Sequence, residues 1–136
     1  MGSPVLMAGS VTVLALLFYF WTGIQVGTMR GRHKILAPAT VGHPEFERAF
    51  RVQMNTLEQL AVFLPLLWLA AIFPISWTWI APLVGVVWVA SRVLYGQAYM
   101  SDPDRRGPWV GIGALCNLVL LVLVVIGLAW AWMHGG

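Results

Sequence analysis

The chain has 136 residues, of which 60% are hydrophobic and only 10% are charged, and its net charge at pH 7 is +3. Soluble domains carry about 25% charged residues, so this composition excludes an ordinary soluble protein and indicates an all-α integral membrane protein. The single cysteine, Cys116, excludes an intrachain disulfide and a cysteine-based metal site. We expect residues 1–136 to form a single domain, and we expect no nucleic-acid partner.

A first membrane span is predicted over residues 5–28. Residues 1–29 carry no charge, and about 20 apolar residues in a helix suffice to cross a bilayer core. The basic residues that follow mark a cytoplasmic loop by the positive-inside rule; they are Arg30, Arg32, His33 and Lys34. Pro38 and Pro44 are expected to keep this loop out of helix.

A second and a third span are predicted over residues 46–73 and 77–100, on either side of Pro74. The charge-free run from Gln59 to Ser91 is too long for one span and too short for two, so both spans must include polar residues. Pro74 is the natural break between them, because proline cannot continue a helix and disfavours helical geometry in the residue before it.

The last span is predicted over residues 108–133, which are apolar and open with Pro108, at a position that favours proline. All eight Lys and Arg residues lie between Arg30 and Arg106. By the positive-inside rule, loops one and three are therefore expected to be cytoplasmic, with both termini on the opposite side of the membrane. The expected fold is a multi-pass four-helix transmembrane bundle.

Polar residues gather on one face of the second predicted span, because residues three and four apart share a helix face. This stripe consists of Arg48, Arg51, Asn55 and Glu58. A second polar face in the third span consists of Arg92, Tyr95 and Tyr99, and Arg105 and Arg106 follow it. A charged side chain at the bilayer centre costs about 2.5 to 3.5 kcal/mol, so such groups pair or face a cavity. Together these residues would line a cationic pocket near the cytoplasmic surface.

Structural roles for the same residues remain open at this point. Arginines near helix ends also snorkel to the interface, and an Arg–Glu pair can lock two helices together without a ligand. Interfacial tyrosines commonly form aromatic belts, and loop arginines can act only as topology determinants. The three histidines, His33, His43 and His134, have no His-x-x-x-His spacing, so no metal site is expected.

The segment from Pro44 to Glu58 resembles the signature of the MAPEG family, the membrane-associated proteins in eicosanoid and glutathione metabolism. Its pattern is Glu-Arg-x-x-Arg-x-x-x-Asn-x-x-Glu. The similarity extends to the four-span layout, to the segment from Arg92 to Tyr99, and to Arg106. The resemblance implies a homotrimer of four-helix subunits, with glutathione bound between neighbouring subunits near the cytoplasmic side.

The resemblance also implies a role for each matching residue. Glutathione's charged ends and amides would be held by Arg51, Asn55, Glu58 and Tyr95. Supporting contacts would come from Gln53, Arg30, Arg92 and Tyr99. Arg106 matches the arginine that activates the thiol, with Arg105 as the fallback because the register of this loop is ambiguous by one residue. A fixed guanidinium makes sense there, because a nearby positive charge favours the thiolate over the thiol.

The implied activity is that of a glutathione transferase or peroxidase with a role in detoxification. Glutathione would be the co-substrate, and its thiolate would attack a lipophilic electrophile from the bilayer or a lipid hydroperoxide. Gln59 stands where leukotriene-forming members carry tyrosine, which argues against a dedicated eicosanoid role. Asp102 and Asp104 place acid near Arg105 and Arg106, where they either quench the activating charge or cap the last helix. Two other hypotheses are a non-catalytic lipid-binding member of the same fold and a structural or transport-associated four-helix membrane protein.

Overall fold

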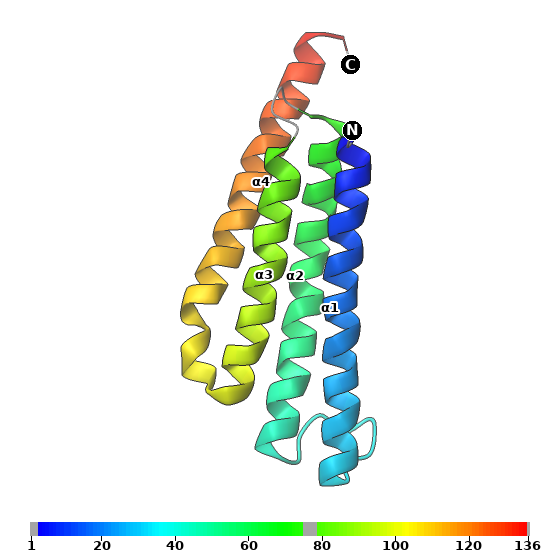
Figure 1. Cartoon of the computed structure of the whole chain (residues 1–136), viewed down its shortest axis with the longest axis vertical. Coiled ribbons are helices and arrows are strands. Elements are labelled where there is room, and N and C mark those ends of the chain that lie inside the picture. The colour runs from blue at the N-terminus through cyan, green and yellow to red at the C-terminus, as the bar shows by residue number, and fades with distance from the viewer. Residues whose placement is uncertain (1–2, 75–78, 136) are drawn as a thin grey trace.

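The computed structural model describes residues 3–74 and 79–135. It contains four helices that are long and apolar enough to cross a membrane, and no strand occurs within the described ranges, which confirms the all-α prediction. The elements are α1 (Pro4–His33), α2 (Pro44–Ile72), α3 (Ile80–Ser101), the short 3-10 helix η1 (Pro103–Arg106) and α4 (Gly107–Met133). Both chain ends lie near one end of the bundle, and the α1–α2 loop and the α3–α4 turn lie near the other (Figure 1).

Local sequence explains where α1 ends and α2 begins. α1 continues past the expected boundary at residue 28 and ends at His33, after which Lys34 adopts a left-handed conformation with φ 56°. Pro44 was expected in the loop, but it is the first residue of α2. Proline is well suited to this position, because the first N–H of a helix has no intrahelical partner and the ring fixes a helical φ.

The other helix ends also follow from proline and from short capping groups. α2 passes through Pro65 without a break and ends at Ile72, before Pro74. The expected start of the third span at residue 77 lies outside the described residues, and α3 begins at Ile80. Asp102 accepts a hydrogen bond from the backbone N–H of Asp104 (3.1 Å), which caps η1.

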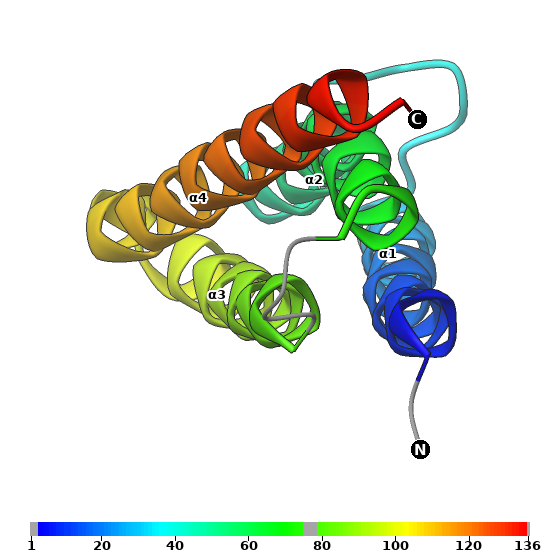
Figure 2. The same ribbon diagram turned by 90° about the horizontal axis from the view of Figure 1, so that it is seen from above.

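α2 and α3 are the inner pair of the bundle, since each contacts all three other helices. Viewed from above, α1 lies beside α2 and α4 lies beside α3 (Figure 2). The rings of Phe63 and Trp88 stack at the α2–α3 contact with their centroids 3.9 Å apart. α3 approaches α1 and α2 closely at Gly85, where an added Cβ would lie 2.9 Å from Cγ1 of Val11. Cys116 of α4 is buried in the same core.

The outward faces of the four helices are strongly apolar. Large exposed side chains occur on every helix, among them Phe20, Val62, Leu83 and Leu115. A water-soluble monomer rarely exposes apolar patches of this extent. The free-energy cost of exposing these side chains to water disappears when lipid or other copies of the chain cover them. The hydrocarbon core of a bilayer is itself apolar.

Candidate functional site

Arg92 of α3 is a buried charge on the inner pair of helices. Its side chain is 4% exposed, and one terminal nitrogen donates to Oδ1 of Asn55 and to Oγ1 of Thr56, each at 3.0 Å. Thr56 donates in turn to the backbone oxygen of Val52. Among the described residues Arg92 has no acidic partner, and its buried Nε–H group donates to no acceptor. The helices therefore hold a guanidinium with neutral groups only, which leaves its positive charge uncompensated.

A row of aromatic and cationic side chains leads from Arg92 to the surface. The guanidinium carbon of Arg92 lies 4.1 Å from the centroid of the Tyr95 ring, and that ring lies 5.7 Å from the ring of Tyr99. The guanidinium carbon of Arg106 lies 5.6 Å from the Tyr99 ring on the far side of the row. These residues meet because positions three and four apart share one face of α3, while η1 folds back beneath it.

The two arginines of η1 have different surroundings. Arg106 is exposed and donates to the backbone oxygen of Pro103 (2.7 Å), which fixes its side chain near Tyr99. The Nε atom of Arg105 lies 3.9 Å from Oδ2 of Asp102, and both side chains are largely exposed. The acid at this turn thus caps η1 and lies beside Arg105, so it does not form an ion pair with Arg106 among the described residues.

Two of the predicted site residues lie on the α1 side of α2. Gln53 faces α1, since a Cβ at Gly23 would lie 3.4 Å from its Nε2 atom. Arg30 of α1 donates to the backbone oxygen of Ala39 (2.9 Å), and its guanidinium carbon lies 4.6 Å from the Phe46 ring centroid. Among the described residues, neither Arg30 nor Gln53 forms a hydrogen bond or ion pair with a member of the row.

The polar stripe predicted on α2 divides in the structure. Arg51 and Glu58 are exposed, and the described residues offer them no hydrogen bond or ion pair. Arg48 is half-buried and reaches the backbone oxygen of Met100 at the end of α3 (3.4 Å). One chain thus brings together Asn55, Arg92, Tyr95, Tyr99 and Arg106, while Arg30, Gln53, Arg51 and Glu58 remain outside that row.

Gln59 of α2 contacts α4, and not the row on α3. Its Oε1 atom accepts a hydrogen bond from Nδ2 of Asn117 on α4 (3.2 Å). The side-chain oxygen of Asn117 is buried and has no partner among the described residues. Gln59 therefore links α2 to α4 inside the bundle.

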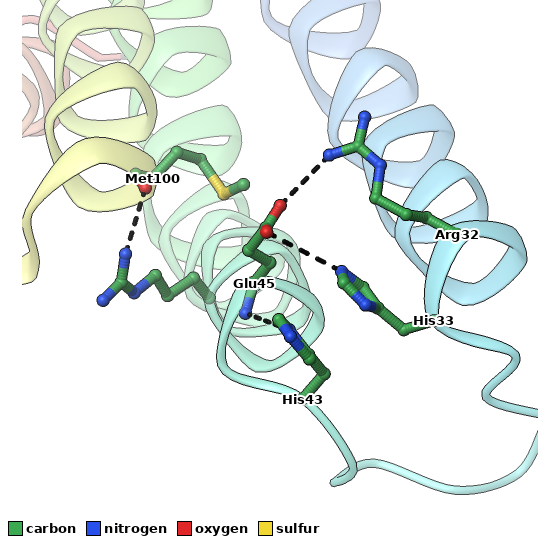
Figure 3. A network of polar contacts seen from close by, with 6 residues as sticks. Arg32, His33, His43, Glu45 and Met100 are labelled. Carbon is green, nitrogen blue, oxygen red and sulfur yellow. Dashed lines mark hydrogen bonds and ion pairs between the residues drawn. The ribbon is translucent and has the colours of Figure 1, made fainter.

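A cluster that spacing rules did not predict lies where α1 and α2 meet the first loop (Figure 3). Glu45 pairs through Oε2 with Arg32 (3.1 Å), and its Oε1 lies 3.8 Å from Nε2 of His33. Its backbone N–H donates to Nδ1 of His43 (3.1 Å), the N-cap of α2. The His33 and His43 rings stack, with centroids 3.5 Å apart. No linear motif reveals this set, because its members meet only when the loop closes.

Comparison with known proteins gives consistent matches over most of the chain. The sequence profile of the MAPEG family matches residues 8–126. An uncharacterized protein of Synechocystis sp. is 40% identical over 120 residues, which cover 88% of this chain and 86% of that protein. Leukotriene C4 synthase of Bos taurus is 34% identical over 128 residues (94% of this chain and 84% of that protein). Microsomal glutathione S-transferase 2 of Homo sapiens is 34% identical over 125 residues (88% and 81%).

Proposed function

Because this chain belongs to the MAPEG family, we propose that it is a membrane-bound glutathione transferase that activates the glutathione thiol as a thiolate. Its four helices and its family make it an integral multi-pass membrane protein. Similarity to a microsomal glutathione S-transferase and to a leukotriene C4 synthase supports a glutathione-related transferase.

The uncompensated charge of Arg92 is the observation that carries this proposal. A guanidinium that is 4% exposed and bonded only to neutral oxygens favours an anionic ligand, because a buried charge without a partner is costly. Glutathione has two carboxylates, an ammonium group and two amides. Arg51 and Arg92 would pair with the carboxylates, Glu58 with the ammonium group, and Asn55 and Tyr95 with the amides. Tyr99 would supply a supporting contact.

Arg106 would activate the thiol at the outer end of the row. An unperturbed thiol has a pKa near 8.5, so only a few per cent is thiolate at neutral pH. A guanidinium within hydrogen-bond reach of the sulfur favours the charged form and lowers that pKa. Support for Arg106 over Arg105 comes from its position beside Tyr99 (5.6 Å), whereas Arg105 lies beside Asp102.

The reaction begins when the thiol releases its proton to solvent. The thiolate then attacks an electrophilic carbon, and the sulfur electron pair forms the new C–S bond. In a substitution, a leaving group departs with the electron pair of its bond to that carbon. When the substrate is a strained cyclic ether, the ring opens and its oxygen takes up a proton. A lipid hydroperoxide would be reduced in two steps. The thiolate attacks the peroxide oxygen to release an alcohol, and a second glutathione reduces the resulting sulfenic acid, giving glutathione disulfide and water. Lipophilic substrates would arrive through the bilayer, which suits a role in detoxification.

We propose that a complete site combines residues of two neighbouring chains in a homotrimer, as the family resemblance implies. Gln53 and Arg30 lie on the α1 side of α2, whereas Asn55 is bonded to α3. A ligand at a subunit interface could contact Asn55, Arg51 and Glu58 of one chain and the α1 side of its neighbour. We further propose that the end of the bundle with the α1–α2 loop and η1 is cytoplasmic, since it holds the basic residues.

The test is an ultraviolet difference spectrum in the thiolate band, recorded on detergent-purified protein as glutathione is added. The wild type should give a saturable thiolate signal and should conjugate an activated aryl chloride. Arg106→Ala should lose the signal and at least about tenfold in conjugation rate, as expected when one electrostatic group is removed from an active site. Arg105→Ala is the matched control, because it removes an equal charge one residue away.

Each outcome distinguishes the proposal from its alternatives. Glutathione binding without a thiolate signal in the wild type would replace the transferase with a non-catalytic binding protein. Absence of glutathione binding would favour a structural or transport-associated protein. If the Arg105 and Arg106 variants lost the thiolate signal and conjugation rate equally, Arg106 would not be the specific thiol activator.

A further inference from the structure

A second candidate site lies at the first loop, apart from the Arg92 row. We infer that His33, His43 and Glu45 bind a divalent transition-metal ion of the zinc class. Their candidate ligand atoms all lie within 4.8 Å of one another. They come from the last residue of α1, the N-cap of α2 and the first turn of α2, so a bound ion would join the two helices.

The Nε2 atom of His33 gives an independent reason for a ligand at this point. It is shielded from solvent and has no hydrogen-bond partner among the described residues, although Glu45 Oε1 is 3.8 Å away. That separation is too long for a hydrogen bond. It is close to the span of a metal bridge, since two ligands bound tetrahedrally to zinc lie about 3.3 Å apart. A buried polar atom without a partner calls for an ion or a water.

The carboxylate of Glu45 is already oriented for such a bridge. Arg32 binds its Oε2 atom at 3.1 Å, which leaves Oε1 as the oxygen nearer His33. Partners of this kind hold metal-binding side chains in place. The Glu45 side chain is 45% exposed and that of His33 is 16% exposed, so an ion can enter from the solvent side.

The donor set indicates which ions would bind. Two imidazole nitrogens and one carboxylate oxygen suit Zn²⁺ with water in a fourth position, and they also suit Ni²⁺ and Cu²⁺. Mg²⁺ and Ca²⁺ prefer oxygen ligands and are disfavoured. The two rings are stacked within 11° of parallel, so their lone pairs do not converge and one ring must turn. Rotation of a histidine ring about its broad second side-chain torsion is readily available.

The ion would stabilise the loop that Arg30 contacts. Arg30 donates to Ala39 within this loop (2.9 Å), and the proposed ligands close the same loop at its two ends. A clip between the helices reduces the number of open loop conformations. The inference does not depend on the proposed function, and its test contains no glutathione.

Metal binding is measured by equilibrium dialysis of untagged, chelator-stripped, full-length protein in detergent against Zn²⁺, with the bound metal quantified per chain. Visible ligand-field absorption with Co²⁺ reports the coordination geometry. The variants are His33→Gln, Glu45→Gln and His43→Asn, in which asparagine retains a side-chain acceptor for the helix N-terminus. The control is His134→Gln, which alters an exposed histidine stacked on Trp130 at the other end of the molecule.

One zinc ion per chain is expected in the wild type and in His134→Gln, with at least tenfold weaker binding in each of the three ligand variants. Circular dichroism identifies any variant that fails to fold. In that case, the wild type is treated with a histidine-modifying reagent with and without Zn²⁺. Zn²⁺ should protect His33 and His43 from modification, and a lack of protection would overturn the inference. Equal zinc binding by the wild type and the folded ligand variants, or no zinc binding by the wild type, would overturn the inference.

Discussion

A single side chain, Arg92, connects the packing of the bundle to its proposed chemistry. It lies on the inner helix pair, where Asn55 and Thr56 share one of its terminal nitrogens. These acceptors are neutral, so they fix the direction of the guanidinium without removing its charge. The same two bonds therefore contribute to stability and keep the charge available for an anionic ligand.

Thr56→Val tests this double role with almost no change in side-chain shape. Thr56 is fully buried, and its loss as an acceptor should destabilise the protein by about 1.5 kcal/mol, the lower end for a hydrogen bond to a charged group. Glutathione affinity should fall as well, because Arg92 keeps only Asn55. Thermal unfolding and calorimetric titration measure the two effects.

The control for this substitution is Thr28→Val. Thr28 is exposed on α1 and, like Thr56, donates to the backbone four residues earlier (2.9 Å). Its replacement should leave both measurements unchanged. If the two valine variants behaved alike, the hydrogen bond from Arg92 to Thr56 would contribute little to stability or to glutathione affinity.

Helix contacts set the position of these side chains, and Gly85 is a point of close approach between α3 and its neighbours. A Cβ there would lie 2.9 Å from Val11 Cγ1 and 3.2 Å from Leu67 Cδ1. Valine has few alternative rotamers within a helix, so it cannot easily move aside. The small residue therefore allows α3 to pack against both α1 and α2. This contact lies about two helical turns from Arg92.

Gly85→Ala should lower the free energy of unfolding by about 1 to 3 kcal/mol through overpacking. Gly9→Ala is the matched control, because a Cβ at Gly9 meets nothing within 4 Å and alanine is the better helix former. Reversible denaturation in mixed micelles compares the two. A stable Gly85→Ala variant would mean that the helices shift apart at small cost.

The sequence predicted the four helices well, because length and apolar composition determine them. It predicted their ends less well, since α1 continues through the basic residues to His33 and Pro44 starts α2. These ends depend on capping and on the closure of the first loop. The cluster of His33, His43 and Glu45 depends on the same closure, so periodicity within one helix gave no sign of it.

On the scale of the whole molecule, the predicted site residues fall into two sets, one that includes Asn55 and Arg92 and one that includes Gln53 and Arg30. Periodicity placed Asn55 on the polar stripe, and the structure joins it to Arg92 of α3. Periodicity could not indicate that Gln53 would face Gly23 of α1, because the neighbour of each face depends on tertiary packing. We predict that the two sets meet at the interface between two subunits.

Co-expression of two inactive variants tests that assembly. Arg30→Ala alters the α1 side and Arg106→Ala alters the row, so each homotrimer should be inactive. If each site takes Arg30 from one subunit and Arg106 from the next, every cyclic trimer that contains both variants has one complete site, about a third of its interfaces. Conjugation activity of mixed oligomers, purified through two different tags, gives the result.

A second pair of variants serves as the control for mixing. Asn55→Ala and Arg106→Ala both alter the set of residues that one chain brings together, so no mixed interface contains a complete site. This pair should remain inactive. Recovery in this pair, or none in the first, would contradict a site shared between subunits.

The burial of Cys116 has a consequence for an enzyme of this kind. Cys116 is the only cysteine in the sequence, and it is 6% exposed within the core. Compounds that react with thiols would therefore find no accessible sulfhydryl on the protein itself. The proposed transferase would thereby be protected from inactivation of its own thiol by the compounds that it conjugates.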